Sequence, residues 1–347
     1  MSDNQKKIGI GVVAALLCCV AFYFLYWVKT PAYSLNIIRE AIQKHDVTTF
    51  ERHVDMDTLY PKAFDDFLVA TDKIEGKNTL ANPLAAGFIQ MFKPPVVAAL
   101  KAATIEGIKG EENNSTEKKD DAANMANNIK GRSGLDKSVF KDVSVISSEG
   151  DTSIVAIKLH NRKVDKDFDL KVKMKKLDDG KWRVKEITNL VDFIVEEHKA
   201  EVAKLAELDK PIKDKIYKAV KIDSTSGQIW SEGDWFPTWK AKGDIRLKNL
   251  TEKDIKAVKG YIQIRDKKNQ VVKSSDLITS TPIKANTVGM LFAQMKINEY
   301  DDKEKVLTTT PAKEFHLAVK IMEVHYTDGT SLARPYALPD PDEKKSK

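Results

Sequence analysis

Cysteine is almost absent from this chain of 347 residues, and the two that occur, Cys18 and Cys19, fall within one apolar run near the N-terminus. No cysteine follows Val28. The polar remainder of the chain therefore has no disulfide bond, no metal site built on thiolates and no cysteine nucleophile.

Other patterns that carry chemistry are missing as well. The six histidines show no metal-ligand spacing: His45, His53, His160, His198, His316 and His325. There is neither a glycine-rich phosphate loop nor a Gly-x-Ser-x-Gly elbow. The sequence thus predicts no catalytic residue, no metal and no cofactor. Charges of both signs alternate throughout and sum to only +6, so we expect no nucleic-acid partner.

The longest apolar run, Ile8–Val28, contains no charged residue. As a helix it spans roughly 30 Å, the thickness of the hydrocarbon core of a bilayer. It ends in an aromatic cluster that suits the headgroup level, Phe22, Tyr23, Phe24, Tyr26 and Trp27. The following Thr30-Pro31-Ala32 is a poor site for signal cleavage. We therefore expect an uncleaved transmembrane anchor over residues 8–28 that contacts the lipid bilayer.

The orientation of this anchor follows from length rather than from charge. Lys6 and Lys7 precede the run, and Lys29, Arg39 and Lys44 follow it, so the local count does not decide. Long domains translocate largely regardless of charge. We expect residues 1–7 in the cytoplasm and the bulk of the chain outside a single-pass cell membrane.

Residues 30–200 predict an α+β domain, with helices first and strands after them. Apolar residues recur at helical spacing from Tyr33 to Leu68. Leu80–Ile108 is the most apolar stretch after the anchor, and Pro94-Pro95 predicts its division into two helices. Glu111–Gly131 is polar and reads as a loop.

The string Tyr33–Leu68 resembles the N-terminal part of an uncharacterised bacterial family, a domain of unknown function found behind a single membrane anchor. The residues that carry the resemblance are Tyr33, Leu35, Ile38, Ala41, Asp46, Phe50 and Val54-Asp55-Met56, where the family usually has an aromatic at the last position. The resemblance implies a domain behind a membrane anchor and no assigned reaction.

Residues 140–187 change to a period of two, which predicts an antiparallel meander. Helices followed by such a meander are similar to the cone-shaped fold of nuclear transport factor 2-like proteins. That fold holds enzymes, ligand binders and interaction domains alike.

A charged stretch over residues 201–220, interrupted by Pro211, predicts a helical linker. Seven short strands then follow in residues 221–336 and suggest an all-β immunoglobulin-like sandwich, which resembles the modules appended to bacterial cell-surface proteins. They lie at 227–230, 239–247, 258–264, 271–274, 289–297, 315–324 and 331–336. The lysine-rich residues 337–347 predict a disordered tail.

Two candidate sites emerge from the apolar and aromatic residues. One is an apolar pocket between the Leu80–Ile108 segment and the alternating strand, lined by Phe88, Phe92, Leu100, Phe168, Leu170, Val172 and Met174. Simple packing of these two faces on each other is the alternative. The other is an interaction surface formed by Trp230, Trp235, Phe236 and Trp239, with packing at the sandwich edge as the alternative.

The leading hypothesis is a non-enzymatic bacterial envelope protein whose modules bind an envelope protein, a glycan or an apolar ligand. The alternatives are an apolar-ligand or lipid-binding protein, and an enzyme that uses a pocket carboxylate, Asp46 or Asp55. Both aspartates precede predicted helices, where a carboxylate also caps backbone N–H groups. Their contacts in a structure discriminate between the enzyme and the binding protein.

Overall fold

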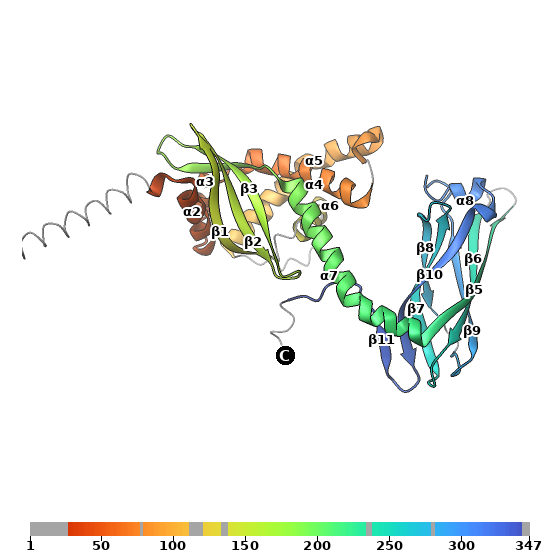
Figure 1. Cartoon of the computed structure of the whole chain (residues 1–347). Helices are drawn as coiled ribbons and strands as arrows, with labels where there is room; N and C mark the ends of the chain where they lie inside the picture. The colour runs from red at the N-terminus through yellow and green to blue at the C-terminus, as the bar shows by residue number, and fades with distance from the viewer. Residues whose placement is uncertain are drawn as a thin grey trace, which may run out of the picture. The chain divides into compact units, whose positions relative to one another are not determined.

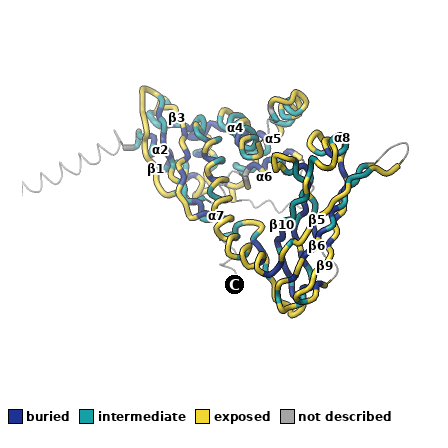
Figure 2. The backbone as a smooth tube through the Cα atoms, turned by 45° about the vertical axis from the view of Figure 1, so that its right-hand side comes forward, coloured by how far each residue is buried: buried dark blue, intermediate teal, exposed yellow. Residues whose placement is uncertain are grey.

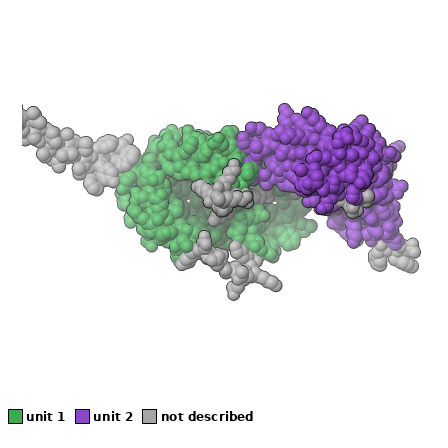
Figure 3. Space-filling model, turned by 90° about the horizontal axis from the view of Figure 1, so that it is seen from below, with its two compact units in different colours: residues 1–202, 339–347 green, residues 203–338 purple. Residues whose placement is uncertain are grey.

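The computed structural model describes residues 27–76, 79–110, 121–132, 138–233, 238–278 and 282–341. The predicted anchor lies outside the described residues except for Trp27 and Val28, which belong to the short 3-10 helix η1 (Trp27–Lys29). Figure 3 shows that the chain forms two compact units, one running to Val202 together with the residues from Pro339, the other Ala203–Leu338. Each unit is described by itself.

The first unit begins with four helices: α2 (Pro31–Gln43), α3 (Val47–His53), α4 (Met56–Glu75) and α5 (Pro83–Lys109), the last two separated by the 3-10 helix η2 (Thr79–Ala81). Each starts after a residue whose side chain accepts a backbone N–H bond: Thr30, Asp46, Asp55 and Asn82. Because these donors have no partner inside the helix, the caps set the helix starts. Helices over Tyr33–Leu68 were predicted and are confirmed.

The predicted break at Pro94-Pro95 is wrong, since α5 is one continuous helix with both prolines inside it. Each proline removes one N–H donor, and the residues whose carbonyls lose that partner, Gln90 and Met91, are exposed. Water can therefore take the place of the missing donors. The loop predicted at Glu111–Gly131 is also wrong in its second part, because α6 (Asp121–Arg132) is a helix. Ala122, Ala126 and Ile129 form its buried face.

An antiparallel meander follows, as predicted. It consists of β1 (Ser138–Glu149), β2 (Thr152–Asn161), β3 (Lys166–Lys176) and β4 (Trp182–Ile187), paired in that order. Helices α2, α3 and α4 lie against this sheet (Figure 1). The core between them contains residues from both layers: Leu35, Ala41, Phe50, Val54, Met56, Ile108, Val155, Val172, Met174, Trp182 and Val184.

Helix α7 (Leu190–Ala219) starts in the first unit and ends in the second. In the first unit its Phe193 packs edge-on against Phe168 of β3, with ring centroids 6.1 Å apart. In the second unit its Ile216 is fully buried in the core. A helix break was predicted at Pro211, and that prediction is wrong because α7 continues through it.

The seven strands predicted for the second unit are all present, most of them longer than expected. They are β5 (Val220–Glu232), β6 (Thr238–Asn249), β7 (Ile255–Asp266), β8 (Val271–Ile278), β9 (Val288–Lys296), β10 (Phe315–Tyr326) and β11 (Ser331–Ala333). They form two antiparallel sheets of sandwich type, ordered β5-β6-β9 and β11-β10-β7-β8. Helix α8 (Val306–Thr309) and the 3-10 helix η4 (Ala312–Glu314) precede β10.

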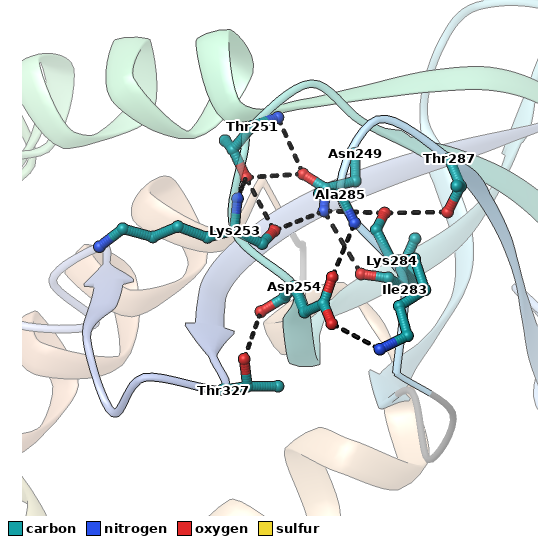
Figure 4. A network of polar contacts seen from close by, with 9 residues as sticks. All are labelled: Asn249, Thr251, Lys253, Asp254, Ile283, Lys284, Ala285, Thr287 and Thr327. Atoms are coloured by element: carbon teal, nitrogen blue, oxygen red, sulfur yellow. Dashed lines mark hydrogen bonds and ion pairs between the residues drawn. The ribbon is translucent and has the colours of Figure 1, made fainter.

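A polar network joins three loops of this unit (Figure 4). The amide of Asn249, which is fully buried, donates to the carbonyl oxygens of Lys253, Ile283 and Lys284 and accepts from Thr251. The carboxylate of Asp254, in the same loop, accepts from the side chain of Lys284 and the backbone of Ala285. The strand ends at this side of the unit are therefore fixed by satisfied hydrogen bonds.

Candidate functional site

Helix α5 exposes a continuous apolar face along its first half. Leu84, Phe88 and Met91 are 78%, 61% and 62% exposed. Their spacing of four and three residues places them on one side of the helix. Residues 81–95 contain no buried residue, and Figure 2 shows this part of α5 in the exposed and intermediate colours. Exposed apolar faces of this kind are common at sites where proteins contact other molecules.

This face is also free of charge. No residue from Thr79 to Phe92 is ionisable, and the first charge after it, Lys93, forms an ion pair with Asp65 of α4 at 2.7 Å. Among the described residues, α5 is the one helix that is long and apolar enough to cross a membrane. It does not lie at the N-terminus, where the anchor was predicted.

The second half of α5 belongs to the core of the first unit. Val96 and Val97 are buried, and Ile108 packs in the cluster with the sheet. Lys101 forms an ion pair with Asp57 of α4, and the Tyr60 hydroxyl lies 2.5 Å from that of Thr104. These contacts hold α5 in the unit, so its two halves have different surroundings.

The predicted ligand-binding residues fall into separate environments. Phe88 is exposed, Phe92 and Leu100 are half-buried, and the four strand residues Phe168, Leu170, Val172 and Met174 are buried. Helix α5 contributes Ile105 and Ile108 to the cluster that contains Val172 and Met174. At ~1.5 Å per residue, Ile105 lies roughly 25 Å along the axis from Phe88. An apolar ligand held by this whole set stays a prediction.

Sequence reasoning missed Leu84 and Met91, which complete the exposed face of α5. The signal was present, since both share the helical spacing of Phe88 within a run that carries no charge. What the run could not show is which of its apolar residues would be left uncovered.

Asp46 and Asp55 cap helices, as predicted. Asp46 Oδ1 accepts from the backbone of Thr49 at 3.0 Å, and the hydrogen bond from the Thr49 hydroxyl, together with this backbone bond, lowers the Asp46 pKa. Burial raises the pKa of Asp55, but hydrogen bonds from Lys185 and Thr58 outweigh it and lower the net value. A general base working near neutral pH needs a raised carboxyl pKa, so these contacts favour the capping role.

Among the histidines, His45 and His53 contact carbonyl oxygens, and His160 and His325 contact carboxylates. His53 is buried, with Nδ1 3.0 Å from the carbonyl oxygen of Trp182, and His45 Nδ1 lies 2.5 Å from that of Ile108. His160 contacts Asp167 on the surface at 2.7 Å. Within the described ranges no group of three or more histidine, cysteine or carboxylate side chains could hold a metal ion.

Of the predicted aromatic surface, Trp230 and Trp239 are described, whereas Trp235 and Phe236 lie outside the described residues. Trp230 pairs with Lys240, and Trp239 pairs with Ser231. Since neighbours along a strand alternate between faces, the two indoles lie on opposite faces of the sheet. Trp239 packs against the core, and Trp230 donates from Nε1 to Glu232 at 2.8 Å.

Comparison with family models finds a similarity in the N-terminal part of the chain. The model of a family described as a protein of unknown function, DUF2939, matches residues 20–109, which include the string Tyr33–Leu68. The predicted resemblance to a family of unknown function is confirmed to that extent. No curated protein matches the chain.

Among the solved structures that match, target SoR45 of the Northeast Structural Genomics Consortium is similar to this chain at 13% identity. The match covers 36% of this chain and 89% of that one, with a TM-score of 0.22. A likeness at this level carries no argument about fold or function.

Proposed function

We propose that this protein is a bilayer-anchored binding protein of the bacterial envelope, and that the first half of α5 rests in the membrane interface. The observation that carries the proposal is the exposed, uncharged face of Leu84, Phe88 and Met91. The anchor Ile8–Val28 tethers the first unit next to a bilayer, with the N-terminus in the cytoplasm and the rest of the chain outside.

Apolar area supports contact with lipid. Moving apolar surface out of water is favourable by about 25 cal/mol per Å², and the three side chains of this face are more than half exposed. The run carries no charge that would have to be desolvated. An apolar helix face of this kind binds in the boundary between headgroups and acyl chains.

In this proposal α5 lies at the membrane interface and does not span the bilayer. Insertion of all of α5 would break the Lys101–Asp57 ion pair and remove Val96, Val97 and Ile108 from the core. Each buried side chain removed from a core costs several kcal/mol. The first half of the helix can enter the interface without disturbing these contacts.

Depth-dependent quenching tests the proposal in the full chain. Cys18 and Cys19 are first replaced by serine, and a fluorophore is attached to Phe88→Cys in protein reconstituted into vesicles that contain brominated lipid. Gln90→Cys is the matched control, because Gln90 is exposed on the same helix but roughly 120° or more away from Phe88. We expect strong quenching at position 88 and weak quenching at 90. Equal quenching at the two positions contradicts the proposal.

The orientation has its own test. A reporter that is active only outside the cytoplasm, fused after Lys347, should be active in cells. An inactive fusion, together with an active cytoplasmic reporter at the same place, would reverse the proposed topology.

A further inference from the structure

The sandwich of the second unit has one open side. In the sheet β5-β6-β9, β5 and β9 are the outer strands, and among the described residues each pairs with β6 alone. Inward-facing residues of β6 are Ala241, Gly243 and Ile245, and their cross-strand partners share that face. The two edges of this sheet can therefore be compared position by position.

The β9 side is closed. The partners of those β6 residues on β9 are Met295, Ala293 and Leu291, and all three are buried. The β5 side is different, because the corresponding partners are Ile229, Gly227 and Thr225. Thr225 and Gly227 are exposed although they face inward. The inner face of the sheet is thus uncovered beside β5.

A cleft of about 300 Å³ occupies this place. One wall is Thr225–Ile229 of β5, and the other is Phe315–Leu317 of β10, with Ile264 of β7 below. Phe315 and Leu317 are only half-buried, although they face the core of the sandwich. The floor is therefore apolar and the rim is polar.

The second wall also has a free edge. Strand β10 pairs with β7 along its length, but β11 pairs with it only at Glu323, Val324 and His325. Beyond these residues, the backbone N–H of Arg334 donates to the carbonyl oxygen of Met322, and its side chain donates to that of Ile321. The pairing of β11 with β10 ends there. In the part of the chain that the structure describes, Phe315–Lys320 has no strand on that side. Two unpaired strand edges thus border one apolar cleft.

We propose that the second unit binds an extended segment of a partner protein in this cleft, by addition of a strand to β5. The segment's backbone pairs with the free edge, and its alternate apolar side chains fill the cleft. Five residues, Thr225–Ile229, make a pairing edge of roughly 16 Å at about 3.3 Å per residue. This function is separate from the membrane contact proposed for α5.

The chemistry of β5 favours a foreign segment over a second copy of this chain. Pairing of β5 with itself would bring Thr225 and Gly227 of the other copy to the cleft, and these are too small and polar to cover Phe315 and Leu317. A segment with valine, isoleucine or leucine at alternate positions covers the same floor with matching apolar surface.

The probes are acetylated nonapeptides in which valine or isoleucine alternates with threonine or glutamate, each paired with a version N-methylated at alternate residues. N-methylation removes backbone donors but keeps the side chains, so it separates strand pairing from apolar adsorption. The protein is the full chain in detergent micelles. Binding is measured by fluorescence anisotropy, and the site is located by amide hydrogen exchange.

We expect at least one unmethylated peptide to bind and to protect the amides of β5, and its N-methylated version to bind at least tenfold more weakly. Thr225→Trp places an indole in the cleft and should lower affinity at least tenfold. Gln294→Trp, at an exposed position of the other edge strand β9, should change affinity less than twofold. Thermal unfolding verifies that each variant is folded. The comparison of methylated with unmethylated peptides uses the natural chain and therefore does not depend on the folding of any variant.

Several results would overturn the proposal. One is binding of every peptide weaker than about 1 mM. Another is equal binding of methylated and unmethylated peptides. Protection of β9 in place of β5 would place the segment at the wrong edge. Protection of β5 that rises with protein concentration, without peptide, would identify a second copy as the occupant.

Discussion

Arg334 and Asp209 form a two-bonded ion pair that joins the end of β11 to helix α7 within the second unit. Arg334 Nε donates to Asp209 Oδ1 at 2.7 Å, and Nη2 donates to Oδ2 at 2.5 Å. The Arg334 side chain is 6% exposed and that of Asp209 is 18% exposed. The hydrogen bonds from Arg334 outweigh burial and lower the pKa of Asp209. Two-bonded pairs of arginine and carboxylate are among the strong hydrogen bonds of proteins.

Asp209→Ala should destabilise the second unit by about 3 kcal/mol, because it leaves a buried guanidinium without its counter-charge. The midpoint of thermal unfolding measures the effect. Glu207→Gln is the matched control on the same helix, since Glu207 pairs with Lys204 in a side chain that is 69% exposed. An unchanged midpoint for Asp209→Ala would mean that the pair contributes nothing to stability.

Because of Glu323, we expect the stability of the second unit to fall at acid pH. Its carboxylate lies 2.6 Å from His325 Nε2 and accepts from Lys259 and Tyr336. The contact with His325 is the largest cause that lowers the Glu323 pKa, to about 2. A carboxyl whose pKa is lowered on folding stabilises the fold above its unfolded value near 4.3, and this stabilisation is lost as the pH falls toward 2.

Glu323→Gln should therefore reduce stability at pH 6 and flatten its dependence on pH between about 4.3 and 2. Chemical unfolding at a series of pH values measures both. If the variant and the natural chain lose stability in parallel over that range, Glu323 is not responsible for the acid dependence.

Replacing two glycines by alanine should change stability in opposite directions, because their surroundings differ. A Cβ at Gly260 of β7 would collide with the backbone oxygen of Lys320 on β10, whereas a Cβ at Gly87 of α5 meets no atom within 4 Å. Gly260→Ala should cost about 1–3 kcal/mol through overpacking. Gly87→Ala should stabilise by about 0.5–1 kcal/mol, because alanine favours the helix. Unfolding midpoints of the two variants test this, and a shared direction of change would contradict the contacts described.

The features that the sequence predicted correctly are local. Asp46 and Asp55 cap helices through bonds that reach only three residues along the chain. The alternation at Phe168, Leu170, Val172 and Met174 defines a buried face within one strand. Neither feature needs knowledge of distant residues, and for that reason both were predictable.

The features that were missed depend on tertiary contacts. Contacts made by α5 on both sides of Pro94-Pro95 hold that helix together in spite of two lost donors. Trp230 and Trp239 lie on opposite faces because of the hairpin register, which the sequence does not reveal. The open cleft beside β5 was missed for the same kind of reason, since its walls come from β5 and β10, about 90 residues apart.

Met174 and Phe88 were both predicted to line one apolar pocket, but the structure places one in the core and the other on the surface. Met174 is fully buried in the cluster beneath the sheet, and Phe88 is 61% exposed on α5. Met174→Ala should lower the free energy of unfolding of the first unit by about 2–5 kcal/mol through the lost contacts and the remaining cavity. Phe88→Ala should change it by less than about 0.5 kcal/mol.

Chemical unfolding of the full chain in detergent, followed by circular dichroism, measures both variants. Phe88→Ala should in addition weaken the contact of α5 with lipid, seen as reduced quenching by brominated lipid of a fluorophore at Met91→Cys in the background without Cys18 and Cys19. Equal destabilisation by the two variants would mean that protein covers Phe88 as fully as the core covers Met174. In that case α5 would have no free face to offer a membrane, and the function proposed for it would be wrong.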